Sequence, residues 1–189
     1  NTLSVRDNVI DIGHSNARFD DLNLTNTTIQ TSDEREKQQI APLTDAEITA
    51  AKGISKLFKT YKWNSAVESK GDNARTHTGV IAQQIETVMS DAGLDISKYA
   101  FWISTTWWET TEEIAATSER VDEDGNVINP AKDAFTKTNI YNHAEDAPEG
   151  ATERNRKGIR YPELLSFIGA ATEQRLTSIE ARLDALETE

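Results

Sequence analysis

The sequence YPELLSFIGAATEQRLTSIEARLDALE, residues 161–187, gives the clearest structural signal in this chain of 189 residues. Within it, small or apolar residues recur at alternating intervals of four and three, the pattern of the a and d positions of a heptad repeat. They are Leu165, Gly169, Thr172, Leu176, Ile179, Leu183 and Leu186. This spacing predicts one long helix over residues 161–187 with an apolar seam along one side.

The residue types in this seam favour a parallel assembly of three or four helices. With Leu176 at position a, Ile179 occupies position d, an arrangement that shifts the preference from dimers towards trimers and tetramers. Two arginines at g positions are each followed, five residues later, by a glutamate at an e position: Arg175 with Glu180, and Arg182 with Glu187. Each exposed pair contributes only ~0.5 kcal/mol, so these pairs select a parallel orientation more than they hold the helices together.

The alternative interpretation is a single amphipathic helix packed on its own domain. The seam covers only about three heptads, and Gly169 and Thr172 make its upstream half less apolar. The match between the g and e charges favours self-association over this alternative. We therefore predict parallel self-association through a C-terminal coiled coil.

Composition excludes several classes of function. The formal net charge is -12 and the sequence pI is about 4.7, so the basic surface that binds nucleic acid or anionic lipid is missing. The chain has no cysteine and its three histidines are far apart, so we expect no disulfide, no metal site and no cofactor. No apolar run reaches the length of a membrane span. A hydrophobic fraction of 37% and a mean hydropathy of -0.61 indicate a thin core, which a chain often completes by oligomerising.

The first part of the chain predicts short strands. Residues 9–13, 22–25 and 27–31 are β-rich runs that have little to pack against alone. Such strands suit the end of an interleaved fibrous trimer, so we predict that residues 1–31 end a β-stalk. A dense cluster of charge begins at Ser32, and we predict a separate domain over residues 32–189.

The central part predicts helices and a β-rich insertion. Apolar residues at helical spacing predict helices over 48–58 and 80–89. Residues 61–63 alternate like a strand, and residues 64–74 have the composition of a polar loop. Residues 104–158 are polar and contain turn signals, which predicts an insertion with a β-hairpin.

Four aromatic residues lead into this insertion: Phe101, Trp102, Trp107 and Trp108. Their residue types are compatible with a platform that stacks on carbohydrate, and equally with anchors in a core or an interface. We favour core or interface anchors, because nothing beyond the residue types supports the carbohydrate interpretation.

A serine and a lysine stand five residues apart in SDEREK, residues 32–37. A lysine can activate a serine nucleophile if the lysine is neutral, which requires the loss of water around it or nearby positive charge. Five residues turn a helix by about 140°, and an odd offset puts side chains on opposite faces of a strand. The backbone between Ser32 and Lys37 must therefore bend, or the lysine must come from another chain. On spacing alone, the preferred interpretation is that Ser32 caps a short helix, with Asp33 and Glu34 in its first turn.

Residues 32–37 resemble the S-D-x-R-x-K signature of the S74 peptidase family, the intramolecular chaperone domain found on phage endosialidases and other tail fibres. Further motifs follow in the family's order. Residues 61–63 resemble its Y-x-W strand, residues 77–83 its H-x-G-x-I-A-Q turn and helix, and residues 161–165 the start of its long final helix. The long polar insertion is most similar to that of the endosialidase-type members.

The resemblance implies a C-terminal chaperone that trimerises a phage tail fibre or tailspike and then releases itself. Ser32 would be the nucleophile, Lys37 its general base, and the bond between Thr31 and Ser32 the one that is cut, in a single turnover. Residues that could support this site are Asp33, Arg35, Arg75 and His77; for Arg75 and His77 an ordinary surface or structural role is an equal alternative. The chaperone would act in the host cytoplasm during assembly, and the fibre part would end in the virion tail.

One residue departs from the family pattern. The position of Glu36 is often apolar in the family, and a carboxylate beside Lys37 favours the charged ammonium and weakens the lysine as a base. We therefore expect Glu36 to point to solvent or to pair with Arg35.

The overall expectation is an α+β fold, mainly helical, with a β-hairpin insertion and a coiled-coil C-terminal helix. With the assembly that the resemblance implies, we expect a parallel homotrimer. The expected partners are other copies of the chain and the preceding fibre domain, with no nucleic acid and no membrane. We expect cleavage to wait for trimerisation, because neighbouring chains would complete the geometry of the dyad. Two alternatives remain: a structural trimerisation tip that never cuts, and a receptor-binding tip that uses Trp102, Trp107 and Trp108.

Overall fold

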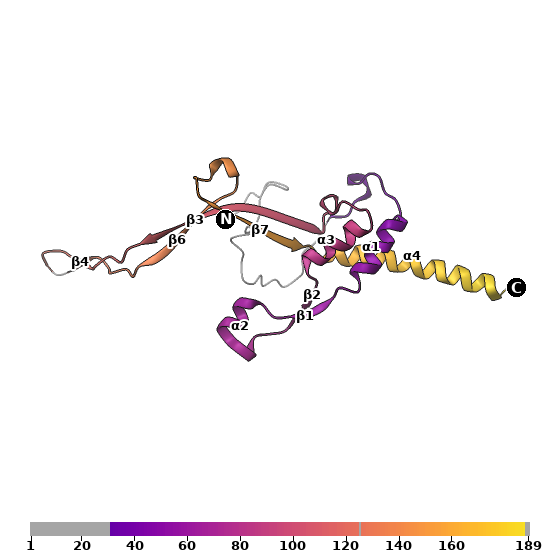
Figure 1. Ribbon diagram of the computed structural model, residues 1–189, viewed down its shortest axis with the longest axis horizontal. Helices are drawn as coiled ribbons and strands as arrows, with labels where there is room; N and C mark the ends of the chain where they lie inside the picture. Colours follow the sequence, from indigo (N-terminus) through magenta and orange to yellow (C-terminus); the bar gives the residue numbers. More distant parts are fainter. Residues whose placement is uncertain (1–30, 125, 188–189) are drawn as a thin grey trace. The chain divides into compact units, whose positions relative to one another are not determined.

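The computed structural model describes residues 31–124 and 126–187, so the short strands predicted before Thr31 lie outside the described residues. The described chain has an α+β architecture that ends in a long helix, as the sequence predicted (Figure 1). It divides into two compact units. The first contains the residues up to Ile103 and those from Lys157 onwards, and the second spans Ser104–Arg156.

The first unit is mainly helical. Its α-helices are α1 (Asp45–Ile54), α2 (Asn64–Lys70), α3 (Ala82–Asp91) and α4 (Tyr161–Glu187). Two short strands, β1 (Lys59–Tyr61) and β2 (His77–Gly79), form an antiparallel pair in which Tyr61 lies opposite His77. The described part of this unit also contains three short 3-10 helices: η1 (Glu34–Glu36), η2 (Gly71–Asn73) and η3 (Ile96–Lys98).

The core of this unit lies between α1, α3 and the first half of α4, with α1 packed against both other helices (Figure 1). Its largest fully buried side chains are Ile54, Ile85, Met89 and Leu164. Burying each of these stabilises the fold by about 1.5–3 kcal/mol relative to an exposed side chain. On α4 the buried residues are Leu164, Phe167 and Ala171, which fall at positions c and f of the heptad pattern. The face of α4 that packs on its own domain is therefore not the a/d face.

Helix α1 begins with a capping box. Thr44 accepts a hydrogen bond from the Glu47 amide, and the Glu47 carboxylate accepts one from the Thr44 amide. Glu47 is also tied to η3, because the hydroxyl of Tyr99 donates a hydrogen bond to Glu47 Oε1 at 2.9 Å. These bonds fix the point at which residues 31–43 enter the folded unit.

We expect Tyr99→Phe to weaken the alkaline pH dependence of the free energy of unfolding. Burial, together with the Glu47 carboxylate, raises the pKa of Tyr99 from 10.0 to about 12 in the folded chain. Between these two pH values the folded chain keeps the tyrosine proton and the unfolded chain loses it, so stability falls as the pH rises. Urea unfolding across this range should show a smaller fall for Tyr99→Phe than for Tyr141→Phe, the control. Equal falls would contradict this role of Tyr99.

The glycine of β2 allows a close approach by the first residue of α4. A Cβ atom at Gly79 would overlap the hydroxyl oxygen of Tyr161, and that hydroxyl accepts a hydrogen bond from the amide of Val80 at 3.1 Å. This contact joins the β1–β2 pair to the start of α4. A side chain at residue 79 would force the two apart.

Gly79→Ala should therefore lower the free energy of unfolding by about 1–3 kcal/mol, the usual cost of an overpacked contact. Gly158→Ala is the matched control, because its Cβ would meet only the Cβ of Ile103, at 3.7 Å. Thermal unfolding of both variants measures the difference. A Gly79→Ala variant as stable as Gly158→Ala would show that the Tyr161 side chain moves aside without lowering the free energy of unfolding.

Three sequence predictions in this unit were wrong in detail. The helix predicted over 48–58 is α1, which ends at Ile54. The strand predicted at 61–63 is shifted upstream, to Lys59–Tyr61, and residue 63 precedes α2. The polar loop predicted over 64–74 is mostly helical, formed by α2 and η2. Helix α2 buries none of its residues, so it has no apolar periodicity from which a helix could be predicted.

The second unit is β-rich, as predicted for the insertion. Strands β3 (Trp102–Ile114) and β7 (Thr152–Ile159) carry the chain into and out of it, and β6 (Phe135–Tyr141) pairs antiparallel with β3. The strand order of the sheet is β6-β3-β7. A hairpin of β4 (Arg120–Val121) and β5 (Val127–Asn129) follows β3, and the 3-10 helix η4 (Ala144–Asp146) follows β6.

The aromatic residues at the start of β3 are largely covered. Phe101 is 3% exposed in the first unit and Trp107 is 6% exposed in the second. The guanidinium of Arg156 lies 5.2 Å from the centre of the Trp107 ring. Such burial supports the interpretation of Phe101 and Trp107 as packing anchors, whereas Trp102 and Trp108 are partly exposed.

Candidate functional site

The side chains of Ser32 and Lys37 meet at the start of the described chain. Lys37 Nζ donates a hydrogen bond to Ser32 Oγ at 2.6 Å. The five-residue offset is bridged by the 3-10 turn η1, in which the amide of Lys37 donates to the carbonyl of Glu34 at 3.0 Å. The bend that the spacing required therefore lies within one chain.

Asp33 caps this turn, and the interpretation of Ser32 as the cap was wrong. Asp33 Oδ1 accepts a hydrogen bond from the amide of Arg35 at 2.9 Å. Because the neighbouring aspartate satisfies this amide, the hydroxyl of Ser32 is left to accept from the lysine. The sequence pattern allowed either residue to cap, since both types favour the position.

The guanidinium of Arg35 pairs with Asp33. Nε of Arg35 lies 3.0 Å from Asp33 Oδ1, and Nη2 lies 2.5 Å from Oδ2. These hydrogen bonds hold the pKa of the Asp33 carboxyl below its usual value. Arg35 therefore does not pair with Glu36, and no hydrogen bond or ion pair of the Glu36 carboxylate occurs among residues 31–124 and 126–187.

The dyad is open to water in a single chain. Residues 31–41 are exposed except for Asp33, which is partly buried. Within the part of the chain that the structure describes, the side-chain hydrogen bonds of residues 32–37 all stay inside this segment. A lysine becomes a base when water is removed from it, and the described residues of one chain do not provide that cover.

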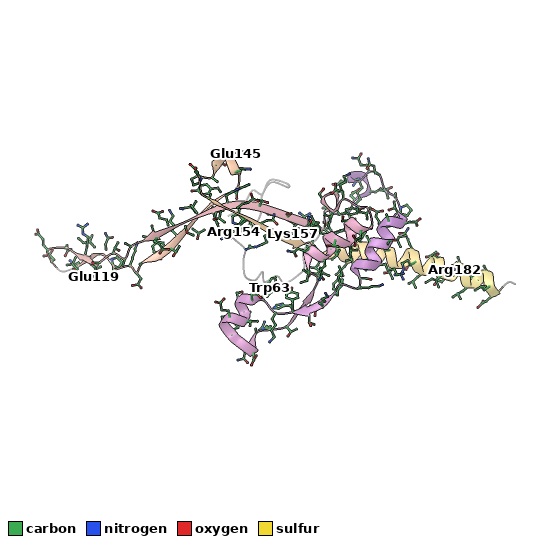
Figure 2. The ribbon with its side chains drawn as sticks, viewed as in Figure 1. Trp63, Glu119, Glu145, Arg154, Lys157 and Arg182 are labelled. Carbon is green, nitrogen blue, oxygen red and sulfur yellow. The ribbon has the colours of Figure 1, made fainter. Side chains whose placement is uncertain are left out.

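Arg75 and His77 are placed elsewhere in the first unit. The His77 ring stacks on Tyr61, with ring centres 5.7 Å apart, and lies edge-on to Trp63 at 6.2 Å. Trp63, labelled in Figure 2, precedes α2. Its side chain is largely exposed, at 53%. Neither Arg75 nor His77 forms a hydrogen bond with the dyad in the described chain, so one chain does not bring them into the site through such a bond.

The a/d face of α4 is exposed over its whole length. Its five large apolar residues are between 46% and 69% exposed: Leu165, Leu176, Ile179, Leu183 and Leu186. The second half of α4 extends past α1 and α3, and Arg182 projects from it (Figures 1 and 2). Since the c/f face already packs on the domain, the a/d residues are not needed to hold α4 in place.

One contact to α4 was not foreseen from the sequence. The amide Nε2 of Gln174, at position f, lies 3.4 Å from the carbonyl oxygen of Leu43. This places the segment that follows the dyad against the c/f face of α4. Only the heptad position of Gln174, on the side away from the seam, hinted at such a contact.

The described residues contain no group of three or more side chains arranged to hold a metal ion. None of their helices has the length and apolar character needed to cross a bilayer.

Comparison with known proteins places these features in a family. Residues 32–94 match the family model Peptidase_S74, described as chaperone of endosialidase. The match begins at Ser32 and covers the dyad, α1, the β1–β2 pair and α3.

Relatives come from phage tails. The chain is 36% identical over 167 residues to a probable tail spike protein of Klebsiella phage 0507-KN2-1, covering 83% of this chain and 12% of that protein. It is 30% identical over 181 residues to the side tail fiber protein pb1 of Escherichia phage T5, covering 96% of this chain and 12% of the fibre protein. The chain thus spans about an eighth of the length of each relative.

A solved structure shares the fold. It is the carboxy-terminal domain of the bacteriophage T5 L-shaped tail fiber with its intramolecular chaperone domain. The TM-score is 0.68 at 28% identity, over 95% of this chain and 38% of that one. Together with the matched family model and the two tail proteins, this likeness shows that the chain carries an intramolecular chaperone domain of the Peptidase_S74 family.

Proposed function

We propose that this chain assembles three copies of a phage tail fibre or tailspike in parallel and then cuts itself free between Thr31 and Ser32. The observation that carries this proposal is the 2.6 Å hydrogen bond from Lys37 Nζ to Ser32 Oγ, at the first residue of the family match. Residues 1–31 would be the end of the fibre, and residues 32–189 the chaperone that is released. Within the chaperone, residues 104–158 would be the insertion and 161–187 the coiled-coil helix.

The proposed reaction is an acyl shift followed by hydrolysis. Lys37 takes the hydroxyl proton of Ser32, and Oγ attacks the carbonyl carbon of Thr31. The new C–O bond forms as the C–N bond breaks, and the amine of Ser32 leaves with the proton that Lys37 returns. Water then opens the ester, which restores the hydroxyl of Ser32 and frees a carboxylate on Thr31. Each chain reacts once.

Assembly would shield the dyad from water, which a single chain does not do in its described residues. The exposed a/d face of α4 offers a surface for two further copies, and its apolar residues gain by leaving water. A neighbouring chain that covers the dyad would remove water from Lys37 and allow it to act as a base. An uncut precursor would then persist until the fibre has assembled in the host cytoplasm.

The test is the N-terminus of the chaperone after expression of the full chain. A fragment that starts at Ser32, found in the trimeric fraction, is the expected result. Full-length chain alone in that fraction would favour the second candidate, a structural trimerisation tip that never cuts. The exposure of the dyad in one chain is the observation that keeps this second candidate open.

A further inference from the structure

Asp33 and Arg35 form an ion-paired turn that begins one residue after the nucleophile. We infer that these two residues are a positioning clamp, which holds Lys37 against Ser32 and keeps the negative charge of Asp33 away from the lysine. This inference rests on the proposed self-cleavage. Asp33 and Arg35 act through Lys37 and take no proton themselves.

The clamp works first through backbone geometry. The Asp33 carbonyl accepts from the amide of Glu36 at 3.2 Å, and the Asp33 side chain accepts from the amide of Arg35 at 2.9 Å. These bonds close the turn that carries Lys37 back to Ser32. Without the side-chain cap, the turn would keep only its two weaker backbone bonds, and the extended alternatives would separate the dyad.

The clamp works second through charge. An unpaired carboxylate between Ser32 and Lys37 in the sequence would stabilise the ammonium form of the lysine and oppose its role as a base. The two-pronged contact with Arg35 occupies both oxygens of Asp33 and compensates its charge. Glu34 and Glu36 are the other charged residues of the turn, and among the described residues no ion pair reaches the turn from another element.

Because the Asp33–Arg35 pair is exposed, its loss should affect cleavage without affecting folding. The Arg35 side chain is 88% exposed and that of Asp33 is 38% exposed. Exposed ion pairs contribute little to global stability. Variants of the clamp should therefore fold and assemble like the wild type, so a change in cleavage rate reports on the dyad.

Four variants of the full chain separate the contribution of the clamp to backbone geometry from its contribution to charge. Asp33→Asn keeps an oxygen for the cap and loses the charge, whereas Asp33→Ala loses both. Arg35→Gln leaves Asp33 charged and unpaired. Glu34→Asp is the control in the same turn, since it keeps the charge of a side chain that has no hydrogen bond or ion pair within the described chain.

The readouts are the single-turnover cleavage rate as a function of pH and the solution mass. Asp33→Ala should cut roughly tenfold more slowly than the wild type, because a small misplacement of a reacting group lowers the rate steeply. Asp33→Asn should lose about threefold or less. Arg35→Gln should move the rate profile to higher pH, Glu34→Asp should match the wild type, and all four should keep the wild-type mass.

Two results would overturn the clamp. If the wild type cuts, and both Asp33→Ala and Arg35→Gln cut at its rate with its pH profile, the clamp is wrong and the self-cleavage stands. If the wild type itself stays uncut, the proposed self-cleavage fails and the clamp falls with it.

Discussion

Ser32→Ala and Lys37→Arg are each expected to slow cleavage of the Thr31–Ser32 bond by roughly a thousandfold or more, since neither variant retains a complete nucleophile and base. Alanine has no hydroxyl to attack the carbonyl. Arginine keeps the positive charge and a hydrogen-bond donor but is never deprotonated in proteins, so it cannot take the proton of Ser32. The time course of the released fragment on a denaturing gel measures both rates.

The matched controls are Ser65→Ala and Lys52→Arg, which change an exposed serine on α2 and an exposed lysine on α1. Both controls should cut at the wild-type rate, and all four variants should assemble like the wild type. Cleavage of Lys37→Arg at the wild-type rate would exclude Lys37 as the base and leave its 2.6 Å hydrogen bond to Ser32 with a structural role only.

Replacing Leu176, Ile179 and Leu183 together with glutamine is expected to reduce the solution mass to that of one chain and to slow cleavage at least tenfold. These side chains are about half exposed in one chain. Burying the remaining exposed surface of each side chain stabilises the assembly by ~1 kcal/mol. The seams of three helices together therefore contribute on the order of 10 kcal/mol to association. Without association, no neighbour covers the dyad.

The control places the same number of glutamines on α4 outside the seam, at Thr177, Ser178 and Ala181. These residues are exposed and fall at positions b, c and f, so the trimer and its cleavage should persist. Light scattering and the gel assay give mass and rate for both triple variants. A monomeric seam variant that cuts at the wild-type rate would show that one chain completes its own active site.

The helical part of the fold was predictable where burial leaves a periodic pattern. Helices α1, α3 and α4 each place apolar residues on a packed face, so their spacing is visible in the sequence. Helix α2 buries nothing and was mistaken for a loop. In α4 the pattern contains two faces, and the sequence revealed the a/d seam more clearly than the c/f face that holds the helix on its domain.

The geometry of the candidate site was harder to predict from the sequence than the helices were. The spacing of Ser32 and Lys37 argued against an encounter on any regular element, and only the resemblance to a family raised it as a catalytic pair. The missing information was the 3-10 turn capped by Asp33, which no periodic pattern marks. The links from Tyr99 to Glu47 and from Gln174 to Leu43 join residues far apart in the sequence and depend on tertiary packing.

Native mass spectrometry of the freshly expressed wild-type chain, followed by denaturation of the same sample, examines assembly and cleavage together. The expected result is a complex of three subunits, each of which begins at Ser32 after denaturation, and free fragments that end at Thr31. A particle with the 21.0 kDa mass of one uncut chain after prolonged incubation would contradict both the trimer and the self-cleavage.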